Sequence, residues 1–392
     1  MKTKPLTQVC NITTGKLDAN AETPNGKYPF FTCAPDPLRI DTFSFDDDVI
    51  LLAGNNAQGN FHLQRYKGKF DAYQRTYVIT ARDGYDIDYI KCSLEQSLQH
   101  LKRIAQGSQT KFLTMQILDS FQVADIPYSD QKRLVGSIKE VENKIAINTK
   151  IVSILESMAK TLYDYWFVQF DFPDENGRPY RTSGGEMVWN AQLKREIPKG
   201  WDCVSLEQYI TIGNTSVDPA SLSNTIMEHY SIPAYDEGGY PAFESAETIQ
   251  SGKYRVHKDA ILVSKLNPQF KRIWDPYCIT ENAICSTEFM VYQAKQKKIR
   301  PFCFALVNSD GFCQHMISKA ISSTGSRKRI QPDVSLTYQF AAPDTESLLL
   351  LFSEIYQPIM DKLKNTKLEN HELTKLRNWL LPMLMNRQAR VE

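Results

Sequence analysis

The chain has 392 residues, of which 42% are hydrophobic and 23% charged, and its formal net charge is +1. This composition is typical of a folded protein with two or three domains, and it excludes a disordered chain and a generally polybasic nucleic-acid binder. The opening residues MKTKPLTQVCNITTG contain no apolar signal region, and no window approaches 18 apolar residues, so we expect a cytoplasmic protein without a membrane segment.

The eight cysteines predict neither a disulfide scaffold nor a metal site. They form no CxxC pair, and the six histidines show no HExxH or other metal-ligand spacing. We therefore expect buried, reduced thiols and no metal.

Residues 1–127 are predicted to form a mixed α/β domain. VILLAG (49–54) and RTYVITA (75–81) have the β-branched and aromatic composition of buried strands. A helix is predicted over residues 93–106, since Leu94, Leu98 and Leu101 share one face and Gly107 is a typical C-terminal stop.

Residues 130–167 are predicted to form one long helix, within a spacer segment that we place at 128–168. Its apolar residues recur at alternating steps of four and three, the seam of a coiled coil: Leu134, Ile138, Val141, Ile145, Asn148, Val152, Leu155, Ala159 and Leu162. At about 1.5 Å per residue the helix spans roughly 55 Å. An ordinary core helix is the alternative, but the length and the polar Asn148 favour a helix that needs a partner.

The second half of the chain repeats this order. A Gly-rich linker (169–195) precedes a second mixed domain (196–342), in which we expect strands at 260–265 and 284–294 and a helix from Phe302 to Ile321. A second apolar periodic stretch then fills residues 343–392. It is predicted to be the helix that pairs with the first.

Residue-by-residue comparison supports an internal repeat. Aligning Gly107-Ser108 with Gly325-Ser326, an offset of 218, also places Leu155 on Leu373 and Leu162 on Leu380. DDDVILLAGNN (46–56) matches HKDAILVSKLN (257–267) at an offset of 211. The predicted fold class is therefore α+β, with two similar α/β domains joined by two long helices that pair as an antiparallel coiled coil with pseudo-twofold symmetry.

This arrangement predicts a protein that reads two short sequences on one DNA duplex. Two stiff antiparallel helices hold two similar domains at a fixed separation of roughly 50 Å, about one and a half turns of B-DNA. Matched half-sites must lie at a set distance and rotational phase along the duplex.

The chain also resembles the specificity subunits of type I restriction-modification enzymes. The resemblance covers essentially the whole chain and is carried by an ordered set of segments: YPFFTC, VILLAGN, FDAYQRTYV, DIPYSDQKRLV, IAINTKIVSILESMAKTLYDYWFVQFD, IPKGW, GSRKRI and LENHELTKLRNWLLPMLM. It implies two target-recognition domains, each reading half of a bipartite site, and helices that bind two methyltransferase subunits. The N-terminus is short for the family pattern, and Pro358 predicts a kink or break in the last helix, since an interior proline costs about 3 kcal/mol.

Catalysis by this chain is disfavoured. NPQF (267–270) resembles the Asn-Pro-Pro-aromatic motif of amino-methyltransferases, but its third residue differs, and GxGxxG and a P-loop are absent. A turn after a strand explains NPQF better, and an exposed loop explains the acidic run Asp46 to Asp48. We therefore expect a non-catalytic subunit with no cofactor of its own; S-adenosylmethionine belongs to the methyltransferase partner.

DNA contacts are expected from Lys and Arg on phosphates and from Arg, Asn and Gln on base edges. In the first domain the candidates are Asn55, Asn56, Gln58 and Asn60, with Arg65, Lys67, Arg75, Arg82 and Lys111 near them. In the second domain they are Lys265, Asn267, Gln269, Lys271, Arg272, Ser326, Arg327, Lys328 and Arg329.

Three functions stay open at this point. The leading one is a DNA-recognition subunit whose partners are double-stranded DNA, two methyltransferase subunits and restriction/translocase subunits. A stand-alone enzyme that modifies nucleic acid and a coiled-coil scaffold without a DNA role are the alternatives. The sequence does not give the recognised bases.

Overall fold

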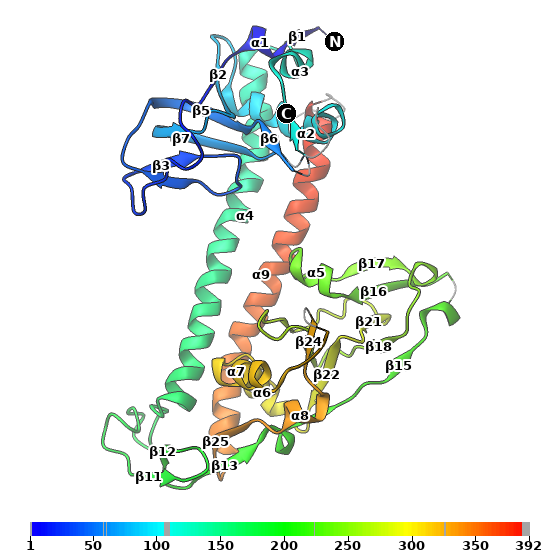
Figure 1. Cartoon of the computed structure of the whole chain (residues 1–392). Coiled ribbons are helices and arrows are strands. Elements are labelled where there is room, and N and C mark those ends of the chain that lie inside the picture. The colour runs from blue at the N-terminus through cyan, green and yellow to red at the C-terminus, as the bar shows by residue number, and fades with distance from the viewer. Residues whose placement is uncertain are drawn as a thin grey trace. The chain divides into compact units, whose positions relative to one another are not determined.

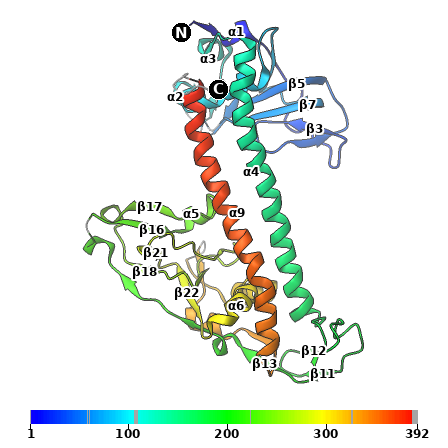
Figure 2. The ribbon, with the colours of Figure 1, turned by 180° about the vertical axis from the view of Figure 1, so that it is seen from behind.

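The structure, a computed structural model, describes residues 2–57, 59, 61–105, 110–222, 224–324 and 327–385. These residues form two compact units (Figures 1 and 2): unit 1 is Met1–Ala146 with Glu372–Glu392, and unit 2 is Ile147–His371. The long helices α4 (Tyr128–Tyr163) and α9 (Ser347–Met385) each contribute to both units. Unit 1 therefore combines two stretches of chain that are distant in sequence, whereas unit 2 is one continuous stretch.

Unit 1 contains a mixed sheet in the order β2-β8-β5-β7-β3-β4. Its pairs are antiparallel except for the parallel pair β3–β7. The strands are β2 (Cys10–Thr14), β3 (Tyr28–Phe31), β4 (Leu38–Ile40), β5 (Phe45–Ala53), β7 (Leu63–Ala72) and β8 (Thr76–Ala81). Alternate residues of β5 serve opposite faces, since Ile50 and Leu52 pack with helix α2 (Ile87–Ile104), while Val49 and Leu51 pack with Phe31 and Phe70.

Short elements flank this sheet. They are β1 (Thr3–Pro5), α1 (Leu6–Val9), β6 (Asn55–Asn56), β9 (Lys111–Phe112), α3 (Met115–Ser120) and β10 (Gln122–Ala124). Strand β1 pairs antiparallel with β10, so the first strand of the first domain is present. Strands β6 and β9 pair with each other and join two turns that are distant in sequence.

Unit 2 contains two larger sheets, in the orders β14-β22-β19-β20 and β15-β18-β21-β16-β17, and the pairs β11–β12, β13–β25 and β23–β24. Its strands are β11 (Met187–Asn190), β12 (Arg195–Pro198), β13 (Trp201–Ser205), β14 (Ile210–Ile212), β15 (Ser216–Val217), β16 (Ile226–Tyr230), β17 (Ala242–Ser245), β18 (Lys253–Arg255), β19 (Ala260–Ser264), β20 (Ile273–Trp274), β21 (Ala283–Ser286), β22 (Phe289–Ala294), β23 (Ile321–Thr324), β24 (Arg327–Arg329) and β25 (Gln339–Pro343). Its shorter helices are α5 (Ile232–Asp236), α6 (Arg300–Val307), α7 (Asp310–Lys319) and α8 (Pro332–Leu336).

The strand registers confirm the internal repeat. In unit 1, Ile79 of β8 lies between Ile12 of β2 and Ile50 of β5. In unit 2, Tyr292 of β22 lies between Ile212 of β14 and Ile261 of β19 in the same way. The copies differ where the continuous strand β7 of unit 1 corresponds to two strands of unit 2, β20 and β21, which belong to different sheets.

Three expectations about single elements were wrong in detail. Of the kink or break expected at Pro358, the break does not occur: α9 is one helix, and Phe352, Tyr356 and Met360 around the proline are buried in the core of unit 2 and hold it despite the missing backbone donor. The helix expected from Phe302 to Ile321 is two helices, since Ser309 caps a new helix by accepting from the Phe312 amide. The strand expected at 284–294 is likewise two strands, β21 and β22.

The two long helices pair antiparallel within each unit. In unit 1, Ile138 of α4 packs with Leu381 and Leu384 of α9. In unit 2, the amide of Asn148, which is 1% exposed, donates to a carboxylate oxygen of Glu369 at 2.8 Å. The polar residue in the seam of α4 thus faces the polar part of α9 that the sequence indicates, and Glu156 and Lys367 form an ion pair at 2.6 Å close by.

Asn148→Leu is expected to stabilise unit 2 by about 1 kcal/mol while loosening the register of the helices, because it replaces a buried amide by an apolar group that has no preferred partner along the seam. Thermal unfolding should show a rise of a few degrees. Zero-length cross-linking of Lys367 should yield Glu156 alone in the unchanged chain and additional carboxylates in the variant. A lower unfolding temperature would contradict the assignment.

Candidate functional site

Three turns of unit 1 meet at one end of the central strand β5. The Gly54 amide donates to the Arg75 carbonyl at 2.8 Å, and the Leu113 amide donates to the Gly54 carbonyl at 2.8 Å. The β6–β9 ladder then sets Asn55 opposite Phe112 and Asn56 opposite Lys111. Residues 54–56, 75 and 111–113 are called turn cluster 1.

Unit 2 repeats this arrangement at the end of β19. The Lys265 amide donates to the Glu288 carbonyl at 2.9 Å, and the Ile330 amide donates to the Lys265 carbonyl at 3.1 Å. Leu266 bridges to Arg329 as Asn55 does to Phe112. Residues 265–272, 288 and 327–330 are called turn cluster 2. Main-chain hydrogen bonds therefore hold both clusters, whichever side chains they carry.

Asn267 locks turn cluster 2 with both its backbone and its side chain. Its amide donates to the Lys328 carbonyl at 2.7 Å, and its side-chain oxygen accepts from the Lys328 amide at 2.9 Å. Its φ of 48° is in the left-handed region, which asparagine tolerates better than most residues. The Phe270 amide donates to the Asn267 carbonyl at 2.9 Å and closes the turn. NPQF is thus a turn after a strand.

The cations of turn cluster 2 fall into two groups. Arg327 and Lys328 are exposed on β24. Arg329 binds Glu288 through two nitrogens, at 3.1 and 2.7 Å, and this hydrogen bonding lowers the pKa of the Glu288 carboxyl. Arg272 binds Asp236 in the same way, at 2.7 and 2.8 Å, and lowers the pKa of that carboxyl. The structure thus separates cations that face solvent from cations that hold the cluster together.

In unit 1 the structure brings together Asn55, Asn56, Arg75 and Lys111, but three expected neighbours lie elsewhere. Arg82 follows the other end of β8 from Arg75, roughly 20 Å away at about 3.3 Å per residue, and donates to the Cys10 carbonyl. Lys67 lies opposite Asp48 in the β5–β7 ladder, far along β5 from the turn. Arg65 forms ion pairs with Asp48 and Asp88. These residues are close in sequence to turn cluster 1 but not in space, because an extended strand separates the residues along its length.

Three candidates, Gln58, Asn60 and Ser326, lie outside the described residues. Sequence reasoning missed Glu288 as a member of turn cluster 2. The sequence match between RTYVIT (75–80) and EFMVYQ (288–293) could have identified Glu288. The first residues of these segments, Arg75 and Glu288, directly precede β8 and β22, and their carbonyls accept the equivalent main-chain hydrogen bond.

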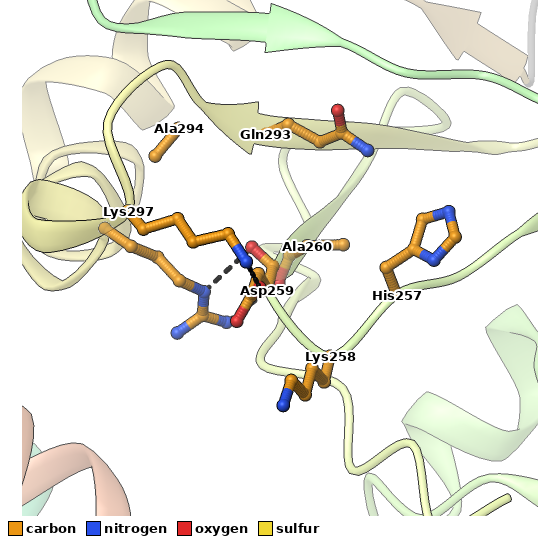
Figure 3. Close-up of a pocket in the computed structure, with 8 residues that line it drawn as sticks. His257, Lys258, Asp259, Ala260, Gln293, Ala294 and Lys297 are labelled. Carbon is orange, nitrogen blue, oxygen red and sulfur yellow. Dashed lines mark hydrogen bonds and ion pairs between the residues drawn. The ribbon is translucent and has the colours of Figure 1, made fainter. Parts of the chain in front are cut away.

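A hollow of about 390 Å³ lies at the opposite end of β19 (Figure 3). Its charged groups largely bind one another, since Lys297 pairs with Asp259 at 2.8 Å and Arg300 donates to the Asp259 carbonyl at 2.9 Å. Arg300 also binds Asp275 at 2.5 Å. This pairing leaves the hollow without a converging set of free groups, and we assign it no role.

The part of the chain that the structure describes contains no cluster of three or more His, Cys, Asp or Glu residues that could hold a metal ion. In the same residues no helix is both long and apolar enough to cross a membrane. The cysteines are free thiols, and burial raises the pKa of Cys10, Cys92, Cys278, Cys285 and Cys303 to about 12.

Comparisons with known proteins point to one family. A model described as a type I restriction modification DNA specificity domain matches residues 1–157. The specificity subunit of the type I restriction enzyme EcoDI from Escherichia coli is 26% identical over 349 residues, which are 85% of this chain and 76% of that protein. The MjaIX specificity subunit from Methanocaldococcus jannaschii is 21% identical over 325 residues, which are 80% and 72% of the two chains. The crystal structure of a type I restriction-modification S subunit from M. genitalium shares the fold, with a TM-score of 0.68 and 14% identity over 98% of this chain and 95% of that one.

Asn267→Ala is expected to destabilise unit 2 by roughly 2 kcal/mol, because it removes the acceptor for the Lys328 amide and places alanine at positive φ. Asn267→Gly removes the same acceptor without the backbone strain, so it should cost roughly 1 kcal/mol. Urea unfolding of the purified chain measures both. Equal losses in the two variants would show that the left-handed conformation contributes nothing.

Proposed function

We infer from these matches that the chain is a specificity subunit of type I restriction-modification enzymes, the DNA-recognition subunit of such a complex. It is a non-catalytic subunit, and the methyltransferase activity belongs to partner subunits. The observation that carries the finer assignment below is the repeated turn cluster, one in each unit, with its polar and basic side chains.

Each turn cluster is proposed to read one half of a bipartite DNA site. The first offers Asn55 and Asn56 beside Arg75 and Lys111, and the second offers Gln269, Lys271, Arg327 and Lys328 around Asn267. Amide groups suit adenine edges, guanidinium groups suit guanine edges, and lysines suit phosphates. Gln58, Asn60, Lys265 and Ser326 remain candidates. Arg272 binds Asp236 on α5 and Arg329 binds Glu288, so both support the cluster first of all, as Arg65 supports the sheet of unit 1. Lys67 and Arg82 are weaker candidates by their position.

The long helices are proposed to dock two methyltransferase subunits, which bind S-adenosylmethionine, and restriction/translocase subunits would complete the complex. An exposed apolar row on α4 supports the docking: Ile147, Ile154 and Met158 are 57%, 52% and 52% exposed. They recur at steps of seven and four and so share one face of the helix. Such a row is unusual on a surface without a partner.

Exchanging residues 1–127 for another first recognition domain is expected to change one half of the methylated motif. The other half should stay the same, because turn cluster 2 lies wholly in unit 2. Methylome sequencing of a host with the original and the exchanged gene measures this. A motif in which both halves or neither half change contradicts the two-reader assignment.

Arg327→Glu with Lys328→Glu is expected to weaken DNA binding by the assembled complex at least tenfold and to reduce the slope of log affinity against log salt by about two, because each phosphate contact releases counterions. Lys258→Glu with Lys298→Glu changes the net charge equally and serves as the control, since both lysines are exposed outside turn cluster 2, one just before β19 and one on the turn Lys297–Ile299. Equal effects of the two pairs would leave the assignment to turn cluster 2 without support.

Ile154→Glu with Met158→Glu is expected to abolish co-purification of a methyltransferase subunit, because docking would bury two carboxylates. Ser153→Glu, an exposed change on another face of the same helix, should leave co-purification intact. Retained co-purification of the double variant would remove this face from the interface.

A further inference from the structure

Phe270 is an exposed aromatic residue in a rigid, basic turn. Its side chain is 56% exposed, and the guanidinium of Arg272 lies 5.3 Å from its ring centroid. A phenyl ring left in water lacks the favourable free energy that burial would give, about 25 cal/mol for each Å² of apolar surface. A single exposed apolar residue is common on protein surfaces, so the case for a role rests on how this one is held and on what surrounds it.

The turn that carries Phe270 is fixed on both sides of the ring. Before it, Asn267 is joined to Lys328 through its backbone amide and its side-chain oxygen, and the Phe270 amide closes the turn. After it, the Lys271 ammonium donates to the Asn308 carbonyl, and Arg272 is held by two hydrogen bonds to Asp236. The ring therefore has little conformational entropy left to lose when a partner covers it.

The groups around the ring match nucleic acid. Gln269 precedes it, Lys271 follows it, and Lys328 lies across the turn on β24. A flat apolar ring among cations and an amide offers stacking to bases and charge to phosphates. An apolar protein partner would find these cations costly to desolvate.

We propose that the ring of Phe270 inserts at a base step of the half-site read by unit 2. The proposal rests on the DNA-recognition function inferred above. Wedges of this kind partly unstack the step and kink the duplex. Arg272 is the positioning residue, since its guanidinium lies over the ring and Asp236 holds it in place. Insertion of the ring costs less at a base step that is easily deformed, so the ring contributes sequence preference through the deformability of the step as well as through direct contacts.

Turn cluster 1 has no aromatic residue at the position that corresponds to Phe270, although Phe112, opposite Asn55, is 40% exposed. Three residues after Asn56, the counterpart of Asn267, the chain has Gly59 with a φ of 72°, and Phe61 nearby is 5% exposed in the core.

The test uses the assembled complex and duplexes that carry its methylated motif, with 2-aminopurine placed through the second half-site. Insertion predicts that one 2-aminopurine position brightens on binding, and that Phe270→Ala removes this signal and weakens binding roughly tenfold to a hundredfold. Phe270→Trp should retain most of both. Phe243→Ala, on β17, removes a 42% exposed phenylalanine and is the matched control.

The possible results distinguish failure of the Phe270 insertion from failure of the DNA-recognition function. If the complex binds a bipartite motif but Phe270→Ala changes neither affinity nor fluorescence, insertion is wrong and DNA recognition stands. If replacing thymine by deoxyuridine in the half-site reproduces the loss and no base brightens, the ring contacts a thymine methyl and insertion is again wrong. If the complex recognises no motif at all, the function itself fails. Circular dichroism melting of each variant checks folding.

Arg272→Lys tests the positioning role. Lysine keeps a charge near Asp236 but cannot hold it with two parallel hydrogen bonds or lie flat on the ring. We expect the fluorescence signal to fall more than the salt slope of binding. A fall in the salt slope with an unchanged signal would mean that Arg272 contacts phosphate and does not position the ring.

Discussion

The narrow apolar seam of α4 is the constraint on which the rest of the structure depends. A seam with a 3.5-residue period can be buried only by another helix, and α9 supplies that helix from the far end of the chain. Leu381 and Leu384 therefore pack against Ile138 and Cys92 in unit 1, although more than 200 residues separate them in sequence. Unit 1 is not a continuous segment of chain, because it needs the C-terminal part of α9 to complete its packing. Asn148 and Glu369 make this pairing specific, since a slipped register would bury the amide without a partner.

The turn clusters show how two copies of one fold can differ in what they bind. The same two main-chain hydrogen bonds hold both clusters. The bond from residue 54 to 75 corresponds to the bond from 265 to 288, and the bond from 113 to 54 corresponds to the bond from 330 to 265. None of them depends on side-chain identity. Side chains at these positions are then free to diverge, and they have: Gly54 corresponds to Lys265, Arg75 to Glu288 and Phe112 to Arg329. A frame fixed by the backbone lets the side chains of such turns change without loss of the fold.

Several of the basic residues that look like DNA contacts in the sequence serve the fold. Arg65 at the start of β7 binds Asp88 on α2, and at the matching junction of unit 2 the polarity is reversed, with Asp275 after β20 binding Arg300 on α6. The junction between strand and helix requires an ion pair, but not a particular order of charges. Removing one partner of such a pair leaves a partly buried charge without its counter-ion. A change at Arg65 is therefore expected to lower the free energy of unfolding, independently of any effect on DNA binding.

The sequence by itself determined the order of elements, the repeat, the two long helices and the polar part of α9 that Asn148 faces, because these follow from local periodicity, turn chemistry and internal similarity. It also placed Asn56, Lys111, Asn267 and Lys328 among the candidate residues. Only the tertiary structure decided which candidates meet. Arg75 joins turn cluster 1 while Arg82, seven residues on, is carried away along β8, and Arg329 turns inward to Glu288 while its neighbour Lys328 faces solvent. The survival of α9 through Pro358 was likewise decided by burial around it. Strand pairing and ion pairing are long-range contacts, and no local pattern encodes which partner a side chain will find.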